Sequence, residues 1–539
     1  MRWWGWGAPD RAPGLPPHAL DFLRESVGIA AQPRPPVALA NVQLPQSGLD
    51  REILAELRGL LGERGVRDEH GERVLHAAGK GYPDLVQLRA GEPHGAPDAV
   101  LYPTDPAQLA PLLELCARRS LALVPFGGGT SVVGGLEPLR GVHRAALALD
   151  LRELADIVAL DRESRIVVAQ GGLRVPALER WLGSSGLTLG HFPQSYEYIS
   201  LGGCAATRSA GQASTGYGRF EELVLGLRLA APAGEIAPAA RPASAAGPDL
   251  RELLVGSEGT LGVIHELTLR VRPVAEQSRY EGVFFADFQA GAAALRALAQ
   301  EELAPAVTRL SDEAETRMSL ALAGSGGIKG RAGRAYLGVR GYGAGCLAIL
   351  GFEGSARELA VRRPAALEVV RRHGGLPVGR APGEAWRAQR FAAPYLRDEL
   401  LTYGVMVETL ETATTWSKLH ELYRAVARAI EGSLAAQGTP GLVLCHISHL
   451  YETGASLYFT FLARQREGEE LAQWHAVKQA AGDAIVAHAG TITHHHAIGT
   501  AHLPWMGREV GPVGLEALRA LKAQLDPLGI MNPGKLLPD

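Results

Sequence analysis

The sequence contains few cysteines, and they lie far apart. Only four occur in 539 residues, and no two of them form a CxxC pair; they are Cys116, Cys204, Cys346 and Cys445. A disulfide framework and a structural zinc site both depend on closely spaced cysteines, so neither is expected. Unpaired cysteines fit a reducing compartment, and we therefore expect a cytoplasmic protein.

Long apolar runs and an excess of one charge are also lacking. No stretch of about 18 residues is apolar and free of charge, so no membrane-spanning helix is expected. The opening, MRWWGWGAPDRAPGLPP, has neither the apolar core nor the small-residue cleavage site of a secretory signal. A net charge of -3 leaves no global field to hold a nucleic-acid backbone, so no nucleic-acid partner is expected.

Glycine and proline are abundant by contrast, with 66 and 34 residues, and 46% of the chain is hydrophobic. This composition is typical of a globular protein that has many turns. A chain of 539 residues exceeds the size at which one hydrophobic core usually stops growing. We therefore expect two or more folded units that share an interface.

The region after residue 104 predicts a helix, a strand and a loop in succession. Apolar residues recur at helical spacing up to Cys116, and the first turn carries Asp105 and Pro106. The next stretch, LALVPF (121–126), is short, apolar and stopped by three glycines. Further strands are expected near 145–151, 157–160 and 165–169.

Later segments predict a change of architecture. A helix is expected from Pro176 to Leu182, followed by a long loop region over 190–220. Beyond a boundary near 274, EGVFFADF and GASLYFTFLA indicate an α+β unit built on a sheet. The Gly-rich stretch 323–334 is expected to be a surface loop.

The strongest single motif is PFGGGTSVVGG, residues 125–135. Three glycines after a strand expose backbone N–H groups that no side chain shields, and such a loop can cradle a diphosphate. Val132 stands where the third glycine of GxGxxG would be, and no GK[ST] completes a P-loop, so nicotinamide and ATP are disfavoured. A tight turn without a ligand is the alternative.

Two more clusters of small and hydroxyl residues follow in the same region. They are HFPQSYEYISLGGCAATRSAGQASTGYG, which begins at His191, and GSEGTLG, residues 256–262. Small residues let the backbone approach a planar ligand, and hydroxyls can hydrogen-bond it. Three such clusters in one α/β unit favour a single large cofactor over three ordinary loops.

The run TITHHHAIG places His494, His495 and His496 side by side. Adjacent residues face opposite sides of a strand and diverge around a helix, which argues against one shared metal ion, so no metal is expected. Imidazoles that face a cavity can transfer protons near pH 7 or stabilise negative charge. A structural hydrogen bond is the alternative, above all for His496.

Tyr458 lies in the alternating segment SLYFTF. Its phenol is expected to share one face of a strand with Ser456 and Thr460, while Leu457 and Phe459 face the other way. A polar face of this kind either lines a site or faces solvent.

Two arginines of the second half, Arg309 in VTRLSD and Arg397 in PYLRDEL, are candidate anion binders. A planar guanidinium donates paired hydrogen bonds to phosphate or carboxylate oxygens. Solvated surface charge is the alternative for both.

Together these pieces resemble the alkyldihydroxyacetonephosphate synthases, a branch of the vanillyl-alcohol-oxidase (PCMH-type) FAD-binding flavoprotein family. The similarity covers nearly the whole chain, through RWWGWG, PFGGGTS, GHFPQSYEYIS, TRSAG, GSEGTLGVI, VTRLSD, YLRDELL, GASLYFTF and THHHAIG. Two departures are present. Residues 500–502 (TAH) replace a lysine of the synthase pattern, and the ending DPLGIMNPGKLLP is similar to flavin-linked 2-hydroxyacid dehydrogenases and oxidases.

The resemblance implies an α+β fold with four parts. Residues 1–95 would form a helical and extended N-terminal segment, and 96–273 a PCMH-type FAD-binding domain of two α/β subdomains. Residues 274–480 would form an α+β cap domain with an antiparallel sheet, which encloses the substrate. The C-terminal segment 481–539 would carry the histidine run and pack against the FAD-binding domain. A homodimer with peripheral membrane contact is also implied.

The cofactor that the resemblance implies is FAD, held non-covalently. The residues implied to contact it are Pro125, Phe126, Gly127, Gly128, Gly129, Thr130, Ser131, His191, Gln194, Ser195, Tyr196, Glu197, Tyr198, Ile199, Ser200, Thr207, Arg208, Ser209, Ala210, Gly256, Ser257, Glu258, Gly259, Thr260, Leu261, Gly262 and Arg309.

The reaction that the resemblance implies is redox-neutral ether-lipid synthesis. A fatty alcohol would replace the acyl group of acyl-dihydroxyacetone phosphate through an adduct at flavin N5. Tyr458 would act as general acid/base, the run His494, His495 and His496 would assist proton movement, and Arg397 would bind the substrate phosphate. The alternatives are a FAD-linked oxidoreductase acting on a hydroxy acid or alcohol, and a flavin-free binding protein with the same fold.

Overall fold

The first sheet contains the expected helix, strand and glycine loop. In this computed structural model, which describes residues 1–8, 14–15, 17–30, 32–322 and 328–538, four strands pair in the order β1-β2-β4-β3. They are β1 (Val66–Arg67), β2 (Ala99–Leu101), β3 (Leu121–Phe126) and β4 (Ala145–Asp150). Strands β2, β4 and β3 are parallel, so the three glycines leave the sheet at its carboxyl edge, where open parallel sheets commonly bind ligands.

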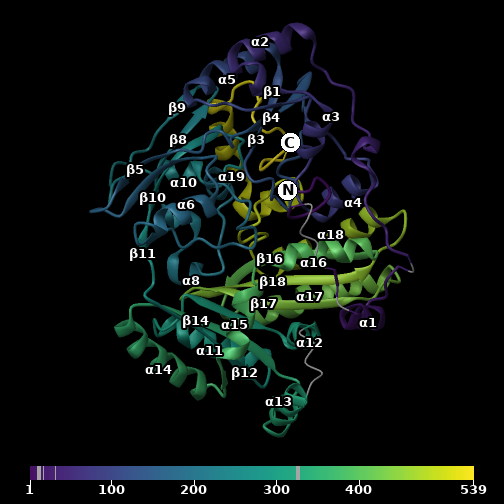
Figure 1. Cartoon of the computed structure of the whole chain (residues 1–539), viewed down its shortest axis with the longest axis vertical. Coiled ribbons are helices and arrows are strands. Elements are labelled where there is room, and N and C mark those ends of the chain that lie inside the picture. The colour runs from purple at the N-terminus through teal and green to yellow at the C-terminus, as the bar shows by residue number, and fades with distance from the viewer. Residues whose placement is uncertain (9–13, 16, 31, 323–327, 539) are drawn as a thin grey trace.

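Helices cover this sheet at the top of the molecule in Figure 1. The predicted helix is α5 (Leu109–Arg119), and α2 (Arg51–Leu61) packs beside it. Leu112 and Cys116 are fully buried, which confirms the stripe expected from the sequence. Residues 1–95 also supply η1 (Leu39–Asn41), η2 (Glu63–Gly65), α3 (His70–Leu75) and α4 (Tyr82–Ala90), and η3 (Pro106–Gln108) precedes α5.

A second, antiparallel sheet has the order β5-β6-β10-β8-β9. Its strands are β5 (Ile157–Asp161), β6 (Ile166–Gln170), β8 (Val224–Ala231), β9 (Gly234–Ile236) and β10 (Val263–Arg270). Helix α6 (Val175–Gly183) begins where Pro176 predicts a helix. The expected loop region 190–220 contains three short helices, α7 (Leu201–Ala206), α8 (Ser214–Tyr217) and the start of α9 (Phe220–Leu223), so the loop prediction is wrong there. Helix α10 (Leu250–Leu254) follows, and a ribbon of β7 (Leu187–Thr188) and β11 (Arg272–Pro273) pairs near the end of this part.

The third sheet is large and antiparallel throughout. Its order is β15-β12-β14-β13-β17-β18-β16. The strands are β12 (Gln277–Phe285), β13 (Val307–Ser311), β14 (Cys346–Gly354), β15 (Leu376–Gly379), β16 (Val405–Thr415), β17 (Leu442–Leu450) and β18 (Gly454–Arg464). The helices in this part of the chain are α11 (Phe288–Gln300), α12 (Glu313–Leu322), α13 (Ile328–Val339), α14 (Ala356–Arg372), α15 (Arg380–Gln389), α16 (Ala393–Thr402), α17 (Leu419–Ala436) and α18 (Glu470–Ala487).

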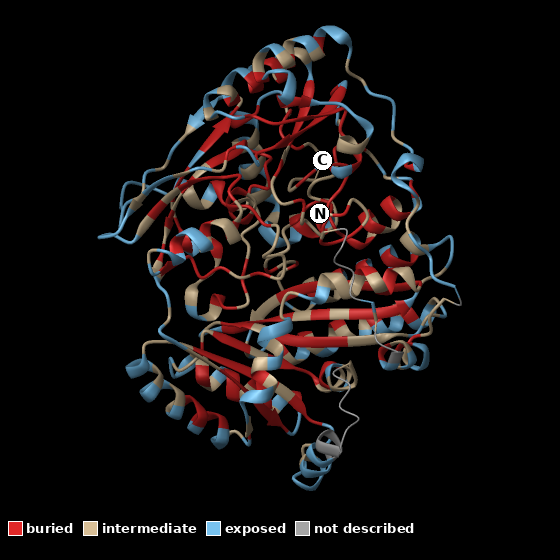
Figure 2. Ribbon diagram, viewed as in Figure 1, coloured by how far each residue is buried: buried red, intermediate tan, exposed pale blue. Residues whose placement is uncertain are grey.

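Side-chain alternation gives this sheet two different faces. Leu457, Phe459 and Phe461 of β18 belong to one large apolar core, together with α11, α14 and α17. Tyr458 and Thr460 lie on the opposite face and line a cavity. The alternation expected for this strand is therefore confirmed, and Figure 2 shows the buried strands with more exposed helices outside them.

The C-terminal segment returns to the first sheet. Met531 bridges to Leu123 of β3, and helix α19 (Leu503–Leu525), bent at Gly511, leads to it. Figure 1 places both ends of the chain between the sheets. Helix α18 runs through residues 480 and 481, so no break in structure occurs at that expected boundary.

The expected Gly-rich loop 323–334 is only partly testable. Residues 323–327 lie outside the described residues, while helix α13 begins at Ile328, so the loop prediction is wrong from that point. No helix in the described part of the chain combines the length and apolar character that crossing a bilayer requires.

A half-buried lysine, Lys522, fastens the C-terminal segment. Lys522 Nζ donates to Thr260 O at 2.6 Å and to Met531 O at 2.8 Å, and it pairs with Asp526 at 2.5 Å. We expect Lys522→Met to lower the free energy of unfolding by about 3 kcal/mol, because it leaves buried oxygens unpaired. Urea denaturation followed by tryptophan fluorescence measures the change.

Arg519→Met is the matched control, because Arg519 lies about one turn earlier on α19 and its partners, exposed Glu516 and the carbonyl of partly exposed Pro538, are not buried. It should change stability by less than about 1 kcal/mol. Equal losses in the two variants would contradict the anchoring role of Lys522.

Candidate active site

A cavity of about 460 Å³ separates the first two sheets from the polar face of the third sheet. The three predicted clusters of small and hydroxyl residues all reach its wall. The lining residues among those implied to bind FAD are Pro125, Phe126, Gly127, Gly128, Gly129, Thr130, Ser131, Gln194, Ser195, Ile199, Ser200, Thr207, Ser209, Ala210, Glu258, Gly259, Gly262 and Arg309. The structure therefore brings together segments that lie more than a hundred residues apart in the sequence.

The glycine loop has no room for side chains. A Cβ on Gly128 would lie 2.3 Å from Tyr198 O, and one on Gly127 would lie 2.3 Å from Ser200 Oγ. Gly129 has a φ of +69°, a conformation that favours glycine. The loop thus presents backbone rather than side chains to the cavity, as a bound diphosphate requires.

Buried polar atoms around the cavity also lack partners. Gln194 Nε2 and Gln212 Oε1 are buried on the wall and have no hydrogen-bond partner among the described residues. An unpaired buried polar atom costs about 1–3 kcal/mol, so these atoms fit a ligand that offers hydrogen-bonding groups. The wall is therefore suited to a large polar cofactor such as FAD.

Nine residues implied to contact FAD lie behind this wall rather than on it. They are His191, Tyr196, Glu197, Tyr198, Arg208, Gly256, Ser257, Thr260 and Leu261. Arg208 illustrates their position, since its guanidinium donates to Val255 O and Glu252 O. Glu197 accepts from Trp6 Nε1 and Tyr395 Oη. These contacts hold the loops in place.

Tyr458 occupies the centre of the opposite wall. Strand register places Glu411 of β16 and His446 of β17 directly across from it on either side. The His446 ring stacks on the phenol with ring centres 4.9 Å apart, and the His496 ring meets it edge-on at 5.6 Å. Burial raises the pKa of Tyr458 to about 12, although a hydrogen bond from Thr409 opposes the shift.

Arg309 is held in a buried triad beside Tyr458. Its guanidinium donates to His446 Nε2 at 2.9 Å and to Glu315 Oε1 at 2.7 Å. His446 Nδ1 lies 3.2 Å from the same Glu315 oxygen, so Nδ1 carries the proton and His446 is neutral. Burial lowers the pKa of His446, which agrees with this tautomer.

A single buried carboxylate holds the histidine run. Glu411 accepts hydrogen bonds from the backbone N–H groups of His494, His495 and His496 at 2.6, 2.9 and 2.8 Å, and from Thr493 Oγ1 at 2.7 Å. Burial favours the neutral acid, but the pKa of Glu411 lies well below its usual range, and the backbone N–H donors favour the carboxylate form at neutral pH. The carboxylate therefore stays charged and fixes the loop on the sheet.

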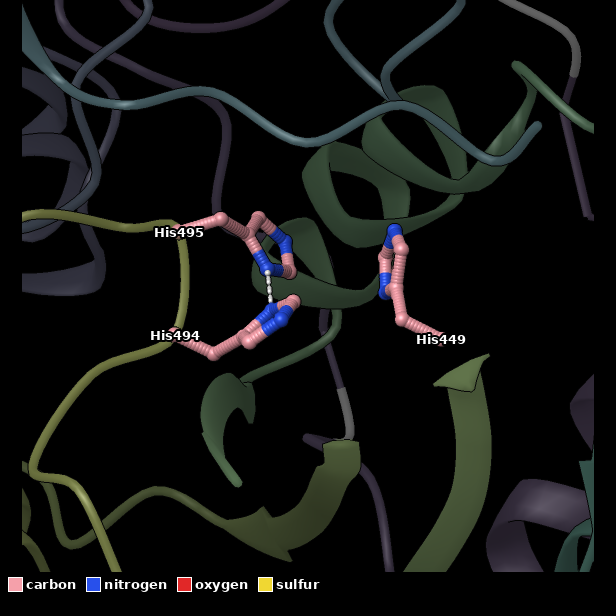
Figure 3. Close-up of side chains that lie close together, drawn as sticks. All are labelled: His449, His494 and His495. Carbon is pink, nitrogen blue, oxygen red and sulfur yellow. Dashed lines mark hydrogen bonds between the residues drawn. The ribbon is translucent and has the colours of Figure 1, made fainter. Parts of the chain in front are cut away.

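The imidazoles of this loop converge, as Figure 3 shows. His494 Nδ1 and His495 Nδ1 lie 3.0 Å apart, and His449 of β17 faces both rings. The expectation that adjacent imidazoles diverge is wrong here, because the loop is neither strand nor helix. Nitrogens of the three rings lie within 4.8 Å of one another, a spacing that one ion can bridge.

Hydrogen bonds within the protein already use ring nitrogens of His449, His494 and His495. His449 Nε2 donates to Gly211 O at 2.9 Å, which leaves its Nδ1 to accept from Ser448 and Ser456. His494 Nε2 meets Tyr451 Oη at 2.5 Å. Burial lowers the pKa of His449 and of His495 to about 3 and lowers those of His494 and His496, so all four imidazoles are neutral near pH 7.

Of the predicted catalytic residues, Tyr458, His495 and His496 line the cavity, while His494 lies behind His495. Arg397 of α16 also lines it, and donates to Lys80 O at 2.6 Å; its Nε has no hydrogen-bond partner among the described residues. The predicted site residues thus meet at one cavity from both halves of the chain.

Sequence reasoning missed several residues on or beside this wall, namely Trp6, Lys80, Glu315, Glu411, His446 and His449. A signal exists for the two histidines, because they occur in the alternating strand LVLCHISHL. Glu411 and Lys80 carry no such signal, since their importance depends on partners far away in the sequence.

The first test concerns Glu411→Gln. The amide has the shape of the carboxylate but turns two donors toward four existing donors, so we expect a loss of about 3 kcal/mol in stability. We also expect a displaced histidine loop, seen as changed histidine NMR signals. Glu509→Gln is the control, because exposed Glu509 accepts from Thr491 and Ile492 in the same loop; similar losses in both variants would refute the special role of Glu411.

Comparison with known proteins gives two family matches. Residues 97–239 match the model for a FAD binding domain, and residues 274–536 match the model for the C-terminal domain of FAD linked oxidases. FAD is therefore the cofactor of this chain.

Proteins similar over most of the chain share one name, which is narrower than the two domain families. An alkyldihydroxyacetonephosphate synthase of Trypanosoma brucei brucei is 32% identical, over 100% of this chain and 92% of the relative. The protein of the same name from Dictyostelium discoideum is 31% identical, over 94% and 84%. A solved alkyldihydroxyacetonephosphate synthase structure superposes with a TM-score of 0.86, at 27% identity and 99% coverage of both chains. The chain belongs to the alkyldihydroxyacetonephosphate synthase family.

Proposed function

We propose that this protein exchanges the acyl group of acyl-dihydroxyacetone phosphate for a fatty alcohol, which forms the ether bond of an ether-lipid precursor. Its relatives carry the name of this activity. The cavity wall is polar around Tyr458, and it also carries a group of apolar residues, here called the apolar branch. A substrate with a phosphate head and a long chain needs both.

The apolar branch is the observation that carries this proposal. It is lined by Met318, Leu396, Leu400, Val407, Leu444 and Leu462. All six belong to one apolar cluster that continues to Leu23 and Val27 of α1 (Pro17–Ser26). Burying a methylene group contributes about 0.8 kcal/mol, so such a lining favours a long alkyl chain over a small hydroxy acid.

When bound, FAD would supply the reactive centre at which the acid is exchanged for the alcohol. Tyr458 is the general acid/base for the acidic C–H of the substrate, because its phenol stands on the cavity wall. The neutral imidazoles of His495 and His496 stand beside it to accept and return protons. Burial keeps these groups uncharged until the substrate arrives.

Arg397 is the proposed phosphate ligand. It lies on the cavity wall with the branch residues Leu396 and Leu400, which are its neighbours on α16. Lys80 adds a buried amine nearby, and burial lowers the pKa of this amine to about 8. A fixed guanidinium suits a phosphate dianion because it donates paired hydrogen bonds.

Product analysis tests the proposal. The FAD-loaded protein is incubated with acyl-dihydroxyacetone phosphate and hexadecanol, and mass spectrometry measures the alkyl product and free fatty acid. Anaerobic mixing with D-lactate, glycolate or an alcohol is the counter-test. Lasting bleaching of the flavin without any ether product would favour the hydroxy-acid or alcohol oxidoreductase.

Tyr458→Phe isolates the phenol. We expect turnover to fall at least about 100-fold, because a positioned acid/base group typically contributes that much or more. FAD binding, measured by flavin absorbance after gel filtration, should be unchanged, since the ring remains.

Tyr423→Phe is the control, because Tyr423 stacks on Phe459 on the far face of the same sheet and pairs with Asp312. It should keep turnover within about threefold, as expected for one lost hydrogen bond outside the site. Near-full turnover of Tyr458→Phe with FAD bound would remove Tyr458 from the chemistry.

A cytoplasmic homodimer that contacts a membrane peripherally remains part of this proposal and rests on the resemblance. The apolar branch supports membrane contact, because long-chain substrates are delivered from lipid. Light scattering and sedimentation with phospholipid vesicles measure the two properties.

A further inference from the structure

Tyr451 connects the histidine run to a second hollow of the molecule. It follows β17, and its hydroxyl meets His494 Nε2 at 2.5 Å. The same residue lines a groove of about 730 Å³, together with Thr453, Arg508 and Glu509. These last three residues are exposed, so the groove opens to solvent.

The contacts form a continuous line from the cavity to this groove. His495 lines the cavity, and its Nδ1 lies 3.0 Å from His494 Nδ1. The other nitrogen of His494 meets Tyr451, which completes the line. His449 lies beside the line but outside it, because its Nε2 is committed to Gly211 O.

Neighbouring charges fix the direction of the hydrogen bonds. Glu411 Oε2 lies 3.4 Å from His495 Nδ1, which favours a proton on that nitrogen. His494 Nδ1 then accepts, and His494 Nε2 carries the proton that points at Tyr451. Arg219 donates to His494 O and interacts with the Tyr451 hydroxyl. Its positive charge disfavours a second positive charge on the His494 ring.

The proposed reaction needs such a line. An ester oxygen is replaced by an ether oxygen, and the fatty acid leaves as a carboxylate, because carboxylic acids are ionised near neutral pH. The hydroxyl proton of the alcohol is therefore released, one per turnover, with no change in oxidation state. The groups argued above to move protons in the cavity, Tyr458, His495 and His496, are neutral before the substrate binds.

We propose that His495, His494 and Tyr451 form a proton relay that carries this proton from the cavity to the solvent groove. The inference rests on the proposed function for its substrate. His495 Nε2 accepts a proton while Nδ1 releases one to His494 Nδ1. His494 Nε2 releases one to the Tyr451 oxygen, and the Tyr451 hydroxyl releases one to water. Each group gains one proton and loses one, so the relay returns to its starting charge. Both imidazoles are then in the opposite tautomer, and each must regain its original tautomer before the next turnover.

Tyr451→Phe in the FAD-loaded protein breaks the last link and keeps the ring. In a single turnover, a pH-indicator dye follows proton release while rapid quenching follows the alkyl product. The parent should release the proton together with the product. In the variant, proton release should lag behind product by at least about 100-fold, the lower contribution of a positioned proton-transfer group. Simultaneous release of both in the variant would overturn the relay.

Two further variants separate a relay from a structural role. Tyr451→His restores an exchangeable proton, so release should again match product formation. Tyr217→Phe removes a different hydroxyl, one that pairs with Glu353, and should leave the timing unchanged. Two results would count against the relay. One is a lag between product and proton release in Tyr217→Phe, and the other is a lag that persists in Tyr451→His.

A readout independent of turnover separates this inference from the proposed function. Exchange of the imidazole N–H protons with water is measured by NMR on protein labelled with ¹⁵N-histidine. Tyr451→Phe should slow exchange at His494 and His495 at least tenfold, while Tyr217→Phe should not. If the parent forms no ether but this slowing is seen, the relay stands and the proposed substrate fails; unchanged exchange overturns the relay itself.

Discussion

The site depends on one buried carboxylate that meets three consecutive backbone N–H groups. Glu411 stands on β16, and its four hydrogen bonds fix residues 493–496 over the polar face of the sheet. Because Tyr458 lies directly across from Glu411 in the strand register, the same contact sets the distance between the phenol and the imidazoles. A charged group at this depth is tolerated only because both of its oxygens accept hydrogen bonds.

A second carboxylate holds the same loop from the other half of the molecule. Glu258 accepts from Ile498 N at 2.8 Å and Gly499 N at 2.7 Å, and its backbone has a φ of +52°. Burial raises the pKa of Glu258 to about 7, although these two N–H groups oppose the shift. The histidine loop is thus held by Glu411 of the large sheet on one side and by Glu258 of the FAD-binding half on the other. The cavity lies between these two parts, and Glu258, His495 and His496 line it.

Local patterns in the sequence predicted much of this arrangement. Three features follow from local spacing: the helix before β3, the glycine stop at 127–129 and the alternation around Tyr458. Residues two positions apart share one face of a strand, and residues three or four apart share one face of a helix, so a buried face leaves a local pattern in the sequence. The convergence of His494 and His495 could not be predicted in this way. Their loop takes its shape from Glu411, a residue 83 positions away from His494, and no local period encodes such a contact.

The N-terminal residues show the same limit. RWWGWG carries the resemblance to the family, but its position follows from contacts with distant residues. Trp6 N donates to Asp398 and Trp6 Nε1 to Glu197, while Lys80 Nζ donates to the carbonyls of Arg2 and Trp3. These contacts place an N-terminal tryptophan on the cavity wall beside Arg397, where neither helical nor strand spacing would have placed it.

Burial also decides what kind of chemistry the cavity supports. It raises the pKa of Tyr458 and lowers those of the surrounding imidazoles, so every one of these groups is neutral before a ligand binds. A wall of neutral donors and acceptors can pass protons without holding a charge, since each group gains a proton on one side as it loses one on the other. Arg309 is already paired with Glu315, and it orients His446 through a second hydrogen bond. Arg397 lies on the same wall as these neutral groups, which is the position that the proposed binding of an anionic phosphate requires.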